Sequence, residues 1–301
     1  MLHVTTQLIC RYVFTVWLVV TLLFVLLRLL PSNALIARSV DAGMTVKEIE
    51  EVLTKEGLNR PIGEQYIGSL IGFFSGQWGS SLKNGQPVSL IVLPRLQNSL
   101  GLVLSSFVII IILGGLLTAF VSLHPNSIFR YGIDLYITLA LSVPIYWTAT
   151  IVFFLIYATQ IGESRNPILP IIVLSVHVIG SLLRFSLTES HIIAHQPYIA
   201  YARAKGLSEG SIWLHHQLPM LLPRLLPFIG TQVVVLLGST VAIETVFGRL
   251  GLGTLLLDAV LNRDYPVAQV TIGLLGLMSV SILTLTSWLS LMFDSQANNE
   301  L

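Results

Sequence analysis

The stretch Tyr198–Pro227, YIAYARAKGLSEGSIWLHHQLPMLLPRLLP, is the longest polar interruption in the second half of a very apolar chain. Its start predicts a short helix, Tyr198 to Lys205, that ends at Gly206. Ser208 predicts the cap of a second helix, because a serine oxygen can accept a hydrogen bond from a free N–H of the first turn. Three prolines punctuate that second helix: Pro219, Pro223 and Pro227. Two short helices joined at a glycine, between apolar segments, are typical of a docking element.

The composition indicates a membrane protein. Of the 301 residues, 54% are hydrophobic and 10% are charged, whereas soluble domains average about 25% charged residues. Most of the surface must therefore face something other than water. The formal net charge of +1 gives no support for nucleic-acid binding. The single cysteine, Cys10, excludes an internal disulfide framework and a multi-cysteine metal site.

Six stretches reach the roughly 20 apolar residues that a transmembrane helix needs. They are Arg11–Leu30, Leu100–Leu123, Leu135–Ala158, Ile168–Leu187, Phe228–Phe247 and Val267–Phe293. The first is expected to be retained, because its apolar core is too long for a signal peptide and no small-residue cleavage site follows it. The sequence therefore predicts an all-α polytopic membrane protein with six transmembrane helices and an extracytoplasmic helical insert between the first two.

Lysine and arginine in the short loops set the orientation, since cytoplasmic loops carry an excess of these residues. With a cytoplasmic N-terminus, the inner side carries Arg11, Arg130, Arg184, Arg203, Lys205 and Arg224, and the outer short loops carry Arg165, Arg249 and Arg263. We therefore expect residues 1–30 to form the N-terminus and first span, 31–97 the extracytoplasmic insert, and 98–301 the membrane core. A cytoplasmic loop is expected at 189–227, and both termini are expected in the cytoplasm.

The order of residues around Gly206 resembles the EAA loop of ABC-importer permeases, and YARAKGLS is closest to the dipeptide, oligopeptide and nickel branch. Ala200 stands where the motif has its acidic residue. The resemblance implies that this loop docks in a groove of a separate ATPase subunit. The residues implied in that coupling are Ala200, Tyr201, Ala202, Arg203, Ala204, Lys205, Gly206, Leu218 and Pro219. On the residues alone, an ordinary amphipathic cytoplasmic loop remains an open alternative.

The region between the first two spans resembles the extracellular insert of the same family. Thr45 and Glu48 fit a capping box that predicts a helix ending at Gly57. A second helix is predicted from Glu64 to Phe74. The glycines and prolines up to Val88 follow the family order, and their local role is turn chemistry.

Two further motifs resemble the family. Pro144 in the third span removes an intrahelical bond and predicts a kink. The end of the fifth span and the segment before the sixth resemble E-x-x-F-x-x-P-G-x-G and R-D-Y-P, although Leu250 replaces the proline. The tail after Asp294 lacks the family's basic residues. A structural or gating role is expected for Pro144, Glu244, Phe247, Gly251, Gly253, Asp264, Tyr265 and Pro266.

No catalytic, cofactor or metal site is expected in this chain. A G-x-x-x-x-G-K-[ST] phosphate loop is missing, so partner subunits would use the ATP. Gly206–Gly210 reads G-x-S-x-G, but a nucleophile elbow needs a strand before the serine, and a polar helical run precedes this one. His191 and His195 share a helical face, yet Ile192 stands where a zincin has its glutamate.

The resemblance covers most of the chain and implies a non-enzymatic permease subunit of an ABC importer. Such a subunit moves peptides, or a small solute such as a nickel chelate, across the cytoplasmic (inner) membrane of a prokaryote by alternating access. The implied partners are a second homologous permease, two cytoplasmic ATPase subunits, an extracytoplasmic solute-binding protein and the lipid bilayer, without nucleic acid. The alternative is a stand-alone secondary transporter or channel, which would show inverted repeats or broken helices with ionisable pairs at mid-membrane. A membrane enzyme is a third reading.

Overall fold

A computed structural model describes residues 2–29, 60–159 and 167–293, together with Thr45, Lys47 and Thr54. Three predicted features lie outside these residues: the helix that the Thr45–Glu48 capping box begins, the loop after Thr159, and the tail after Phe293. The chain forms two compact units. One consists of Met1–Ile9, Ser99–Arg249 and Ser281–Leu301, and the other of Cys10–Asn98 and Leu250–Val280. The expected boundaries at residues 30 and 97 stay predictions.

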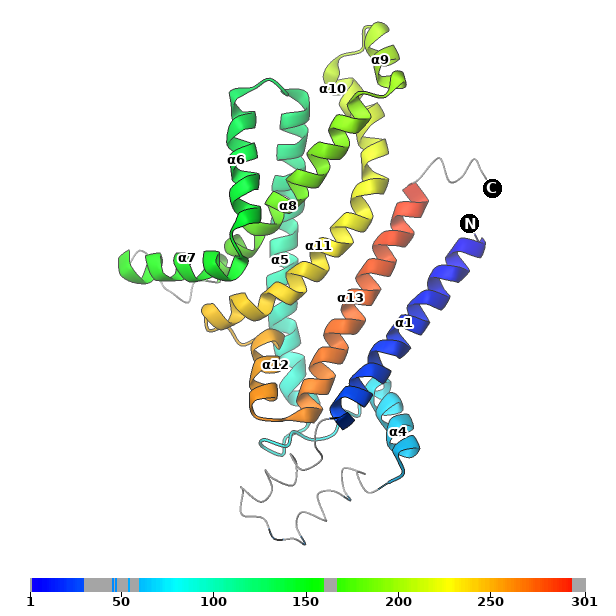
Figure 1. Cartoon of the computed structure of the whole chain (residues 1–301), viewed down its shortest axis with the longest axis vertical. Helices are drawn as coiled ribbons and strands as arrows, with labels where there is room; N and C mark the ends of the chain where they lie inside the picture. Colours follow the sequence, from blue (N-terminus) through cyan, green and yellow to red (C-terminus); the bar gives the residue numbers. More distant parts are fainter. Residues whose placement is uncertain are drawn as a thin grey trace. The chain divides into compact units, whose positions relative to one another are not determined.

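Regular structure in the described residues is helical, apart from an isolated β-bridge between Ser80 and Pro87. The helices are α1 (Leu2–Leu29), α4 (Ile62–Ser75), α5 (Val88–Leu123), α6 (Ile128–Ser142), α7 (Ile145–Thr159), α8 (Ile168–Ala194), α9 (Pro197–Ala204), α10 (Glu209–Ile212), a π-helical turn (Trp213–Gln217), α11 (Leu218–Val246), α12 (Leu252–Leu261) and α13 (Tyr265–Phe293) (Figure 1). The predicted all-α class is confirmed.

Five helical segments are long and apolar enough to cross a membrane. They are Thr6–Leu26, Val88–Leu123, Ile168–Ala194, Glu209–Val246 and Tyr265–Phe293. Each overlaps one of the predicted spans, and several begin earlier than expected. The second span begins at Val88, because Pro94 lies inside α5 without ending it. The predicted polytopic architecture is therefore confirmed for these five segments.

The third predicted span, Leu135–Ala158, is not one kinked helix. The chain forms α6 and α7, which are bent by 102° from one another (Figure 1). A residue before proline is pushed out of the α region, and Val143 is extended with φ −98° and ψ 122°. Pro144 cannot donate the N–H that would continue α6. The described residues therefore contain five candidate spans, or six when this bent pair is counted as one.

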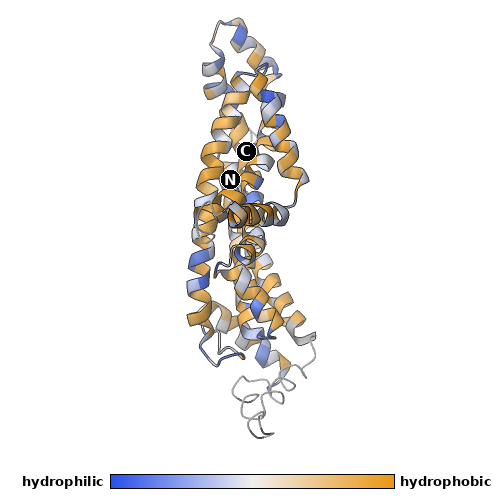
Figure 2. Ribbon diagram, turned by 90° about the vertical axis from the view of Figure 1, so that its left-hand side faces the viewer, coloured by the Kyte–Doolittle hydropathy of each residue, from blue (hydrophilic) through white to orange (hydrophobic). Residues whose placement is uncertain are grey.

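The core of the first unit is built around α8, which packs against α6, α7 and α11. Leu174 and Leu183 on α8 are completely buried. A glycine allows the closest approach: a Cβ atom on Gly180 would lie 2.5 Å from the Cβ of Ala140 on α6. Figure 2 shows mostly hydrophobic residues along these helices and hydrophilic ones gathered where α9 and α10 lie.

The second unit contains α4, α12 and the neighbouring parts of α1, α5 and α13. Its core includes Val88 and Leu252, both completely buried. The predicted helix from Glu64 to Phe74 is confirmed as α4, and Tyr66 on it forms a 2.8 Å hydrogen bond with Thr21 on α1. The short helix α12 was not predicted from the sequence.

Candidate functional site

The first candidate site is the element that begins at α9. Gly206 follows this helix with φ +82°, and its N–H donates to the carbonyl of Arg203 over 2.9 Å. The N–H of Leu207 donates to the carbonyl of Ala202, which completes a Schellman motif. No atom would crowd a Cβ at position 206. The positive φ, rather than lack of space, therefore favours glycine, and the predicted helix end is confirmed.

The second helix begins as predicted but does not stay short. The Ser208 side chain accepts a hydrogen bond from the N–H of Ser211 over 3.3 Å, so it caps α10. The chain then runs through the π-helical turn, in which the N–H of Leu218 bonds to the carbonyl of Trp213, and directly into α11. We call the continuous segment Glu209–Val246 the rod; it has 38 residues. The wide turn lies just before Pro219, which carries no N–H to extend an α-helical ladder.

The two short helices are fastened to each other, and this corrects one expectation. Ile199 and Ala202 on α9 pack against Ile212 on α10, and Ala202 is only 4% exposed. Its side chain therefore faces α10 and is not available to a partner. Across the turn, Arg203 donates two hydrogen bonds to Glu209, at 2.7 and 3.1 Å. This bonding raises the pKa of Arg203. Pro197–Ile212 thus forms one compact piece, which we call the coupling element.

The outward face of the coupling element carries most of the other expected residues. Ala200, Tyr201 and Ala204 are exposed, and the Lys205 ammonium lies 4.6 Å from the centroid of the Tyr201 ring. Small side chains beside an aromatic ring and a cation leave a surface that another backbone can approach closely. Of the two residues at the motif end, Pro219 is exposed and Leu218 is half-buried, both at the start of α11.

Two side-chain pairs hold α8 and α11 together below the coupling element. The rings of Phe185 and Phe228 stack with centroids 4.1 Å apart and planes 3° apart. Arg224 donates to Glu189 over 2.7 Å, and the Glu189 side chain is 21% exposed. These pairs join α8 to α11 through both a ring contact and an ion pair.

The second predicted motif is divided between the two units. Glu244 and Phe247 belong to the first unit and Gly251 and Gly253 to the second. Glu244 lies in the last turn of α11, is 2% exposed, and accepts a 2.5 Å hydrogen bond from Ser99 on α5. Phe247 packs edge-on against Phe153 of α7. These contacts place Glu244 inside the helix bundle, and no sequence pattern singled out Ser99.

Asp264 is the centre of a buried hydrogen-bond cluster in the second unit. Its carboxylate is 3% exposed and accepts hydrogen bonds from the Ser81 hydroxyl (2.5 Å) and from the N–H groups of Leu82 (3.0 Å) and Lys83 (3.4 Å). Nearby, the Lys83 ammonium pairs with Asp258 at 2.9 Å. Asp264 therefore ties the turn before α5 to the connection between α12 and α13. Lys83 and Asp258 were not singled out from the sequence.

The remaining motif residues shape helix ends. The N–H of Gly251 donates to the Thr254 hydroxyl at the start of α12, over 3.0 Å. Tyr265 and Pro266 open α13, where the missing N–H of proline leaves no intrahelical bond unmade. Asn98 donates to the carbonyl of Leu250 over 2.7 Å, so the residue in place of the family proline is held by a side chain.

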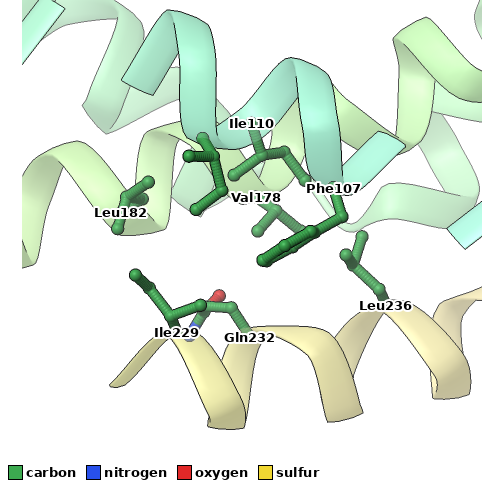
Figure 3. A pocket seen from close by; sticks show the side chains of 8 residues that line it. Phe107, Ile110, Val178, Leu182, Ile229, Gln232 and Leu236 are labelled. Carbon is green, nitrogen blue, oxygen red and sulfur yellow. The ribbon is translucent and has the colours of Figure 1, made fainter. Parts of the chain in front are cut away.

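A small hollow lies between α5, α8 and α11 in the first unit (Figure 3). Its volume is about 220 Å³ including the space at its open mouth. Phe107, Val178 and Leu182 represent its apolar lining, and Gln232 on α11 is the polar member. Elsewhere, the rings of His191 and His195 lie 4.3 Å apart. Within the described ranges, no three His, Cys, Asp or Glu side chains form a group suited to a metal ion.

Comparison with known proteins identifies a family to which this chain is similar. Residues 110–298 match the family described as "Binding-protein-dependent transport system inner membrane component". The chain belongs to this family. A putative peptide transport system permease protein of Brucella suis biovar 1 is 32% identical over 93% of this chain and 94% of the relative. The oligopeptide transport system permease protein AppB of Bacillus subtilis is 29% identical over 81% of this chain and 83% of its own length.

Membership accounts for the main features of this inner membrane component. The resemblance to ABC-importer permeases is confirmed, and a multi-pass membrane permease agrees with the apolar spans. The roles expected for the individual residues of the coupling element and of the two motifs stay predictions.

Proposed function

We propose that this chain is the peptide-translocating permease subunit of an ATP-driven importer. The names of relatives that align along most of the chain support peptides as the cargo. A nickel chelate, which the sequence resemblance also allowed, finds no support in those names. The chain would lie in the cytoplasmic membrane beside a second homologous permease and would receive its cargo from an extracytoplasmic solute-binding protein.

The coupling element is the single observation that carries this proposal. It is a compact helical pair whose outward face presents Ala200, Tyr201, Ala204 and Lys205. Its inner side is locked by a small apolar core and a two-bonded ion pair. We infer that this face docks on a cytoplasmic ATPase subunit, that two such subunits supply the ATP hydrolysis, and that the chain has no ATPase site of its own.

The contacts between the coupling element and the spans support a proposal of alternating access. When the ATPase subunits close, they displace the coupling element. The stacked rings of Phe185 and Phe228 and the Arg224–Glu189 pair pass the displacement to α8 and α11. Because α8 and α11 both line the hollow around Gln232, their movement changes the space between these helices and α5. The rival interpretation as a stand-alone transporter requires charged side chains at a broken span, and the break between α6 and α7 carries no Asp, Glu, Lys, Arg or His from Ala140 to Thr148.

Co-purification tests the docking face. A charge placed on this face by Ala200→Asp or Ala204→Asp should abolish capture of the ATPase subunits by the tagged permease. In the docked complex, a partner packed closely against these small side chains would leave no space for a hydrated carboxylate. Asn126→Asp is the matched control, since it adds the same charge on an exposed turn between α5 and α6. Capture that survives both alanine variants, or capture that Asn126→Asp also abolishes, would contradict the proposed docking face.

A further inference from the structure

Proline leaves an acceptor on α11 without its normal donor. In an α-helix, the carbonyl of residue i accepts from the N–H of residue i+4. Pro227 has no N–H, so it cannot serve the carbonyl of Pro223, one turn earlier. An unpaired carbonyl is costly in a membrane, where no water replaces the missing bond. Something outside the α11 backbone must therefore serve this oxygen.

Ser290 on α13 supplies the missing bond. Its hydroxyl donates to the Pro223 carbonyl over 2.6 Å, and both residues belong to the same compact unit. Two other serines on this helix behave differently. Ser279 and Ser287 each donate to the carbonyl four residues earlier on α13 itself, as serines in membrane helices commonly do. Ser290 reaches across to another helix instead.

The two helices are in close contact beside this bond. A Cβ atom on Gly230 would lie 2.1 Å from the Thr286 hydroxyl oxygen and 3.0 Å from the Thr286 Cβ, so the two helices approach closely at this position. Thr286 lies one helical turn before Ser290 on α13. Close approach at a small residue combined with a polar bond is how membrane helices associate. The Ser290 bond therefore belongs to a packed contact rather than to an isolated encounter.

The position of this contact relates it to coupling. Pro223 lies beside Arg224, whose ion pair with Glu189 joins this part of the rod to α8. The rod continues without interruption from Pro223 back to α10. Whatever displaces the coupling element also displaces the Pro223 carbonyl.

We propose that Ser290 is a positioning residue for transport. Its hydroxyl joins α13 to the rod at Pro223, so that the last span moves with the coupling element. This inference rests on the proposed importer function. The hydroxyl touches no cargo; it acts by keeping two helices in register while the ATPase subunits drive one of them. Loss of the bond then uncouples ATP hydrolysis from uptake, while the chain still binds the ATPase subunits and the second permease.

A double-mutant cycle in the complete transporter tests the proposal, using peptide uptake per ATP hydrolysed in vesicles. Ser290→Ala should lower this ratio about threefold, the factor expected for one hydrogen bond between membrane helices. Ser290→Thr keeps the hydroxyl and should restore the ratio. Pro227→Ala gives Pro223 its intrahelical donor back, so adding Ser290→Ala to that variant should change nothing further. Ser287→Ala is the control, because its hydroxyl bonds within α13.

Disulfide formation separates the two ways of failing. In a Cys10→Ser background, Gly230→Cys and Thr286→Cys should cross-link in the full chain if α11 and α13 are in contact. Cross-linking with an unchanged uptake ratio in Ser290→Ala overturns the positioning role and leaves the importer function standing. Absence of the cross-link overturns the contact itself. A wild-type complex without ATP-dependent uptake overturns the importer function and this inference with it.

Discussion

At the scale of single residues, the left-handed backbone of Gly206 offers a test of the proposed docking role. A residue with a Cβ pays roughly 1–2 kcal/mol in the left-handed region, and Asn pays less than other residues because its side chain bonds locally. With φ +82° and open space around it, position 206 should accept Asn best, then Ala, and Val worst. We expect normal membrane levels for all three variants and loss of uptake in that order. Equal uptake by Gly206→Val and the wild type would show that the turn is a plain connector.

Asp264 and Asp258 are close in sequence but should differ strongly in their effect on stability. Asp264→Ala leaves the Ser81 hydroxyl and the Leu82 N–H without their acceptor, which costs about 1–3 kcal/mol for each unsatisfied group. Asp258→Ala breaks an ion pair in which the Lys83 and Asp258 side chains are 43% and 52% exposed, so it should cost no more than about 1 kcal/mol. Thermal unfolding of the purified chain should therefore show a large decrease in Tm only for Asp264→Ala. Similar decreases in both variants would contradict the conclusion that Asp264 is the central acceptor of this hydrogen-bond cluster.

At the scale of elements, the contact between α6 and α8 depends on one missing methyl group. Gly180→Ala brings two Cβ atoms within 2.5 Å and should force the helices apart, at about 1–3 kcal/mol for overpacking. Ala140→Gly removes the opposing Cβ and should restore most of the lost stability when combined with it. The measurement is the Tm of the single and double variants. A double variant no more stable than Gly180→Ala would mean that something other than this contact limits the packing.

Elements that the sequence predicted well are those whose signal is local. The apolar runs, the Ser208 cap and the Gly206 helix end each follow from a few adjacent residues. The features that the sequence did not predict depend on contacts between segments far apart in the chain. Pro144 predicted a kink, but the size of the bend is set by packing of α7 on α8 and α11. The resemblance implied that Ala202 takes part in the coupling, yet its side chain packs against Ile212 and is 4% exposed. Buried polar contacts such as Ser99 with Glu244 join residues far apart in the sequence, and no single pattern announces them.

At the scale of the whole molecule, the orientation in the membrane can be tested by labelling. In a Cys10→Ser background, a cysteine at Asn84 should react with an impermeant maleimide in intact cells, because the excess of Lys and Arg places that turn outside. A cysteine at Ala204 should react only after permeabilisation. Both positions are exposed, so burial cannot explain a difference. The reverse pattern would place the coupling element on the side without ATP and contradict the importer function.

The unbroken rod also has a geometric consequence. At 1.5 Å per residue, Pro223 lies about 21 Å from Glu209 and about 35 Å from Val246. If the bond from Ser290 acts as a fulcrum, the rod is a lever with unequal arms. Its far end, which carries Glu244, would then sweep about 1.6 times as far as the end that we propose to dock on the ATPase, by the ratio of those lengths. A small displacement at the cytoplasmic side would thereby be amplified where the span meets the outer side.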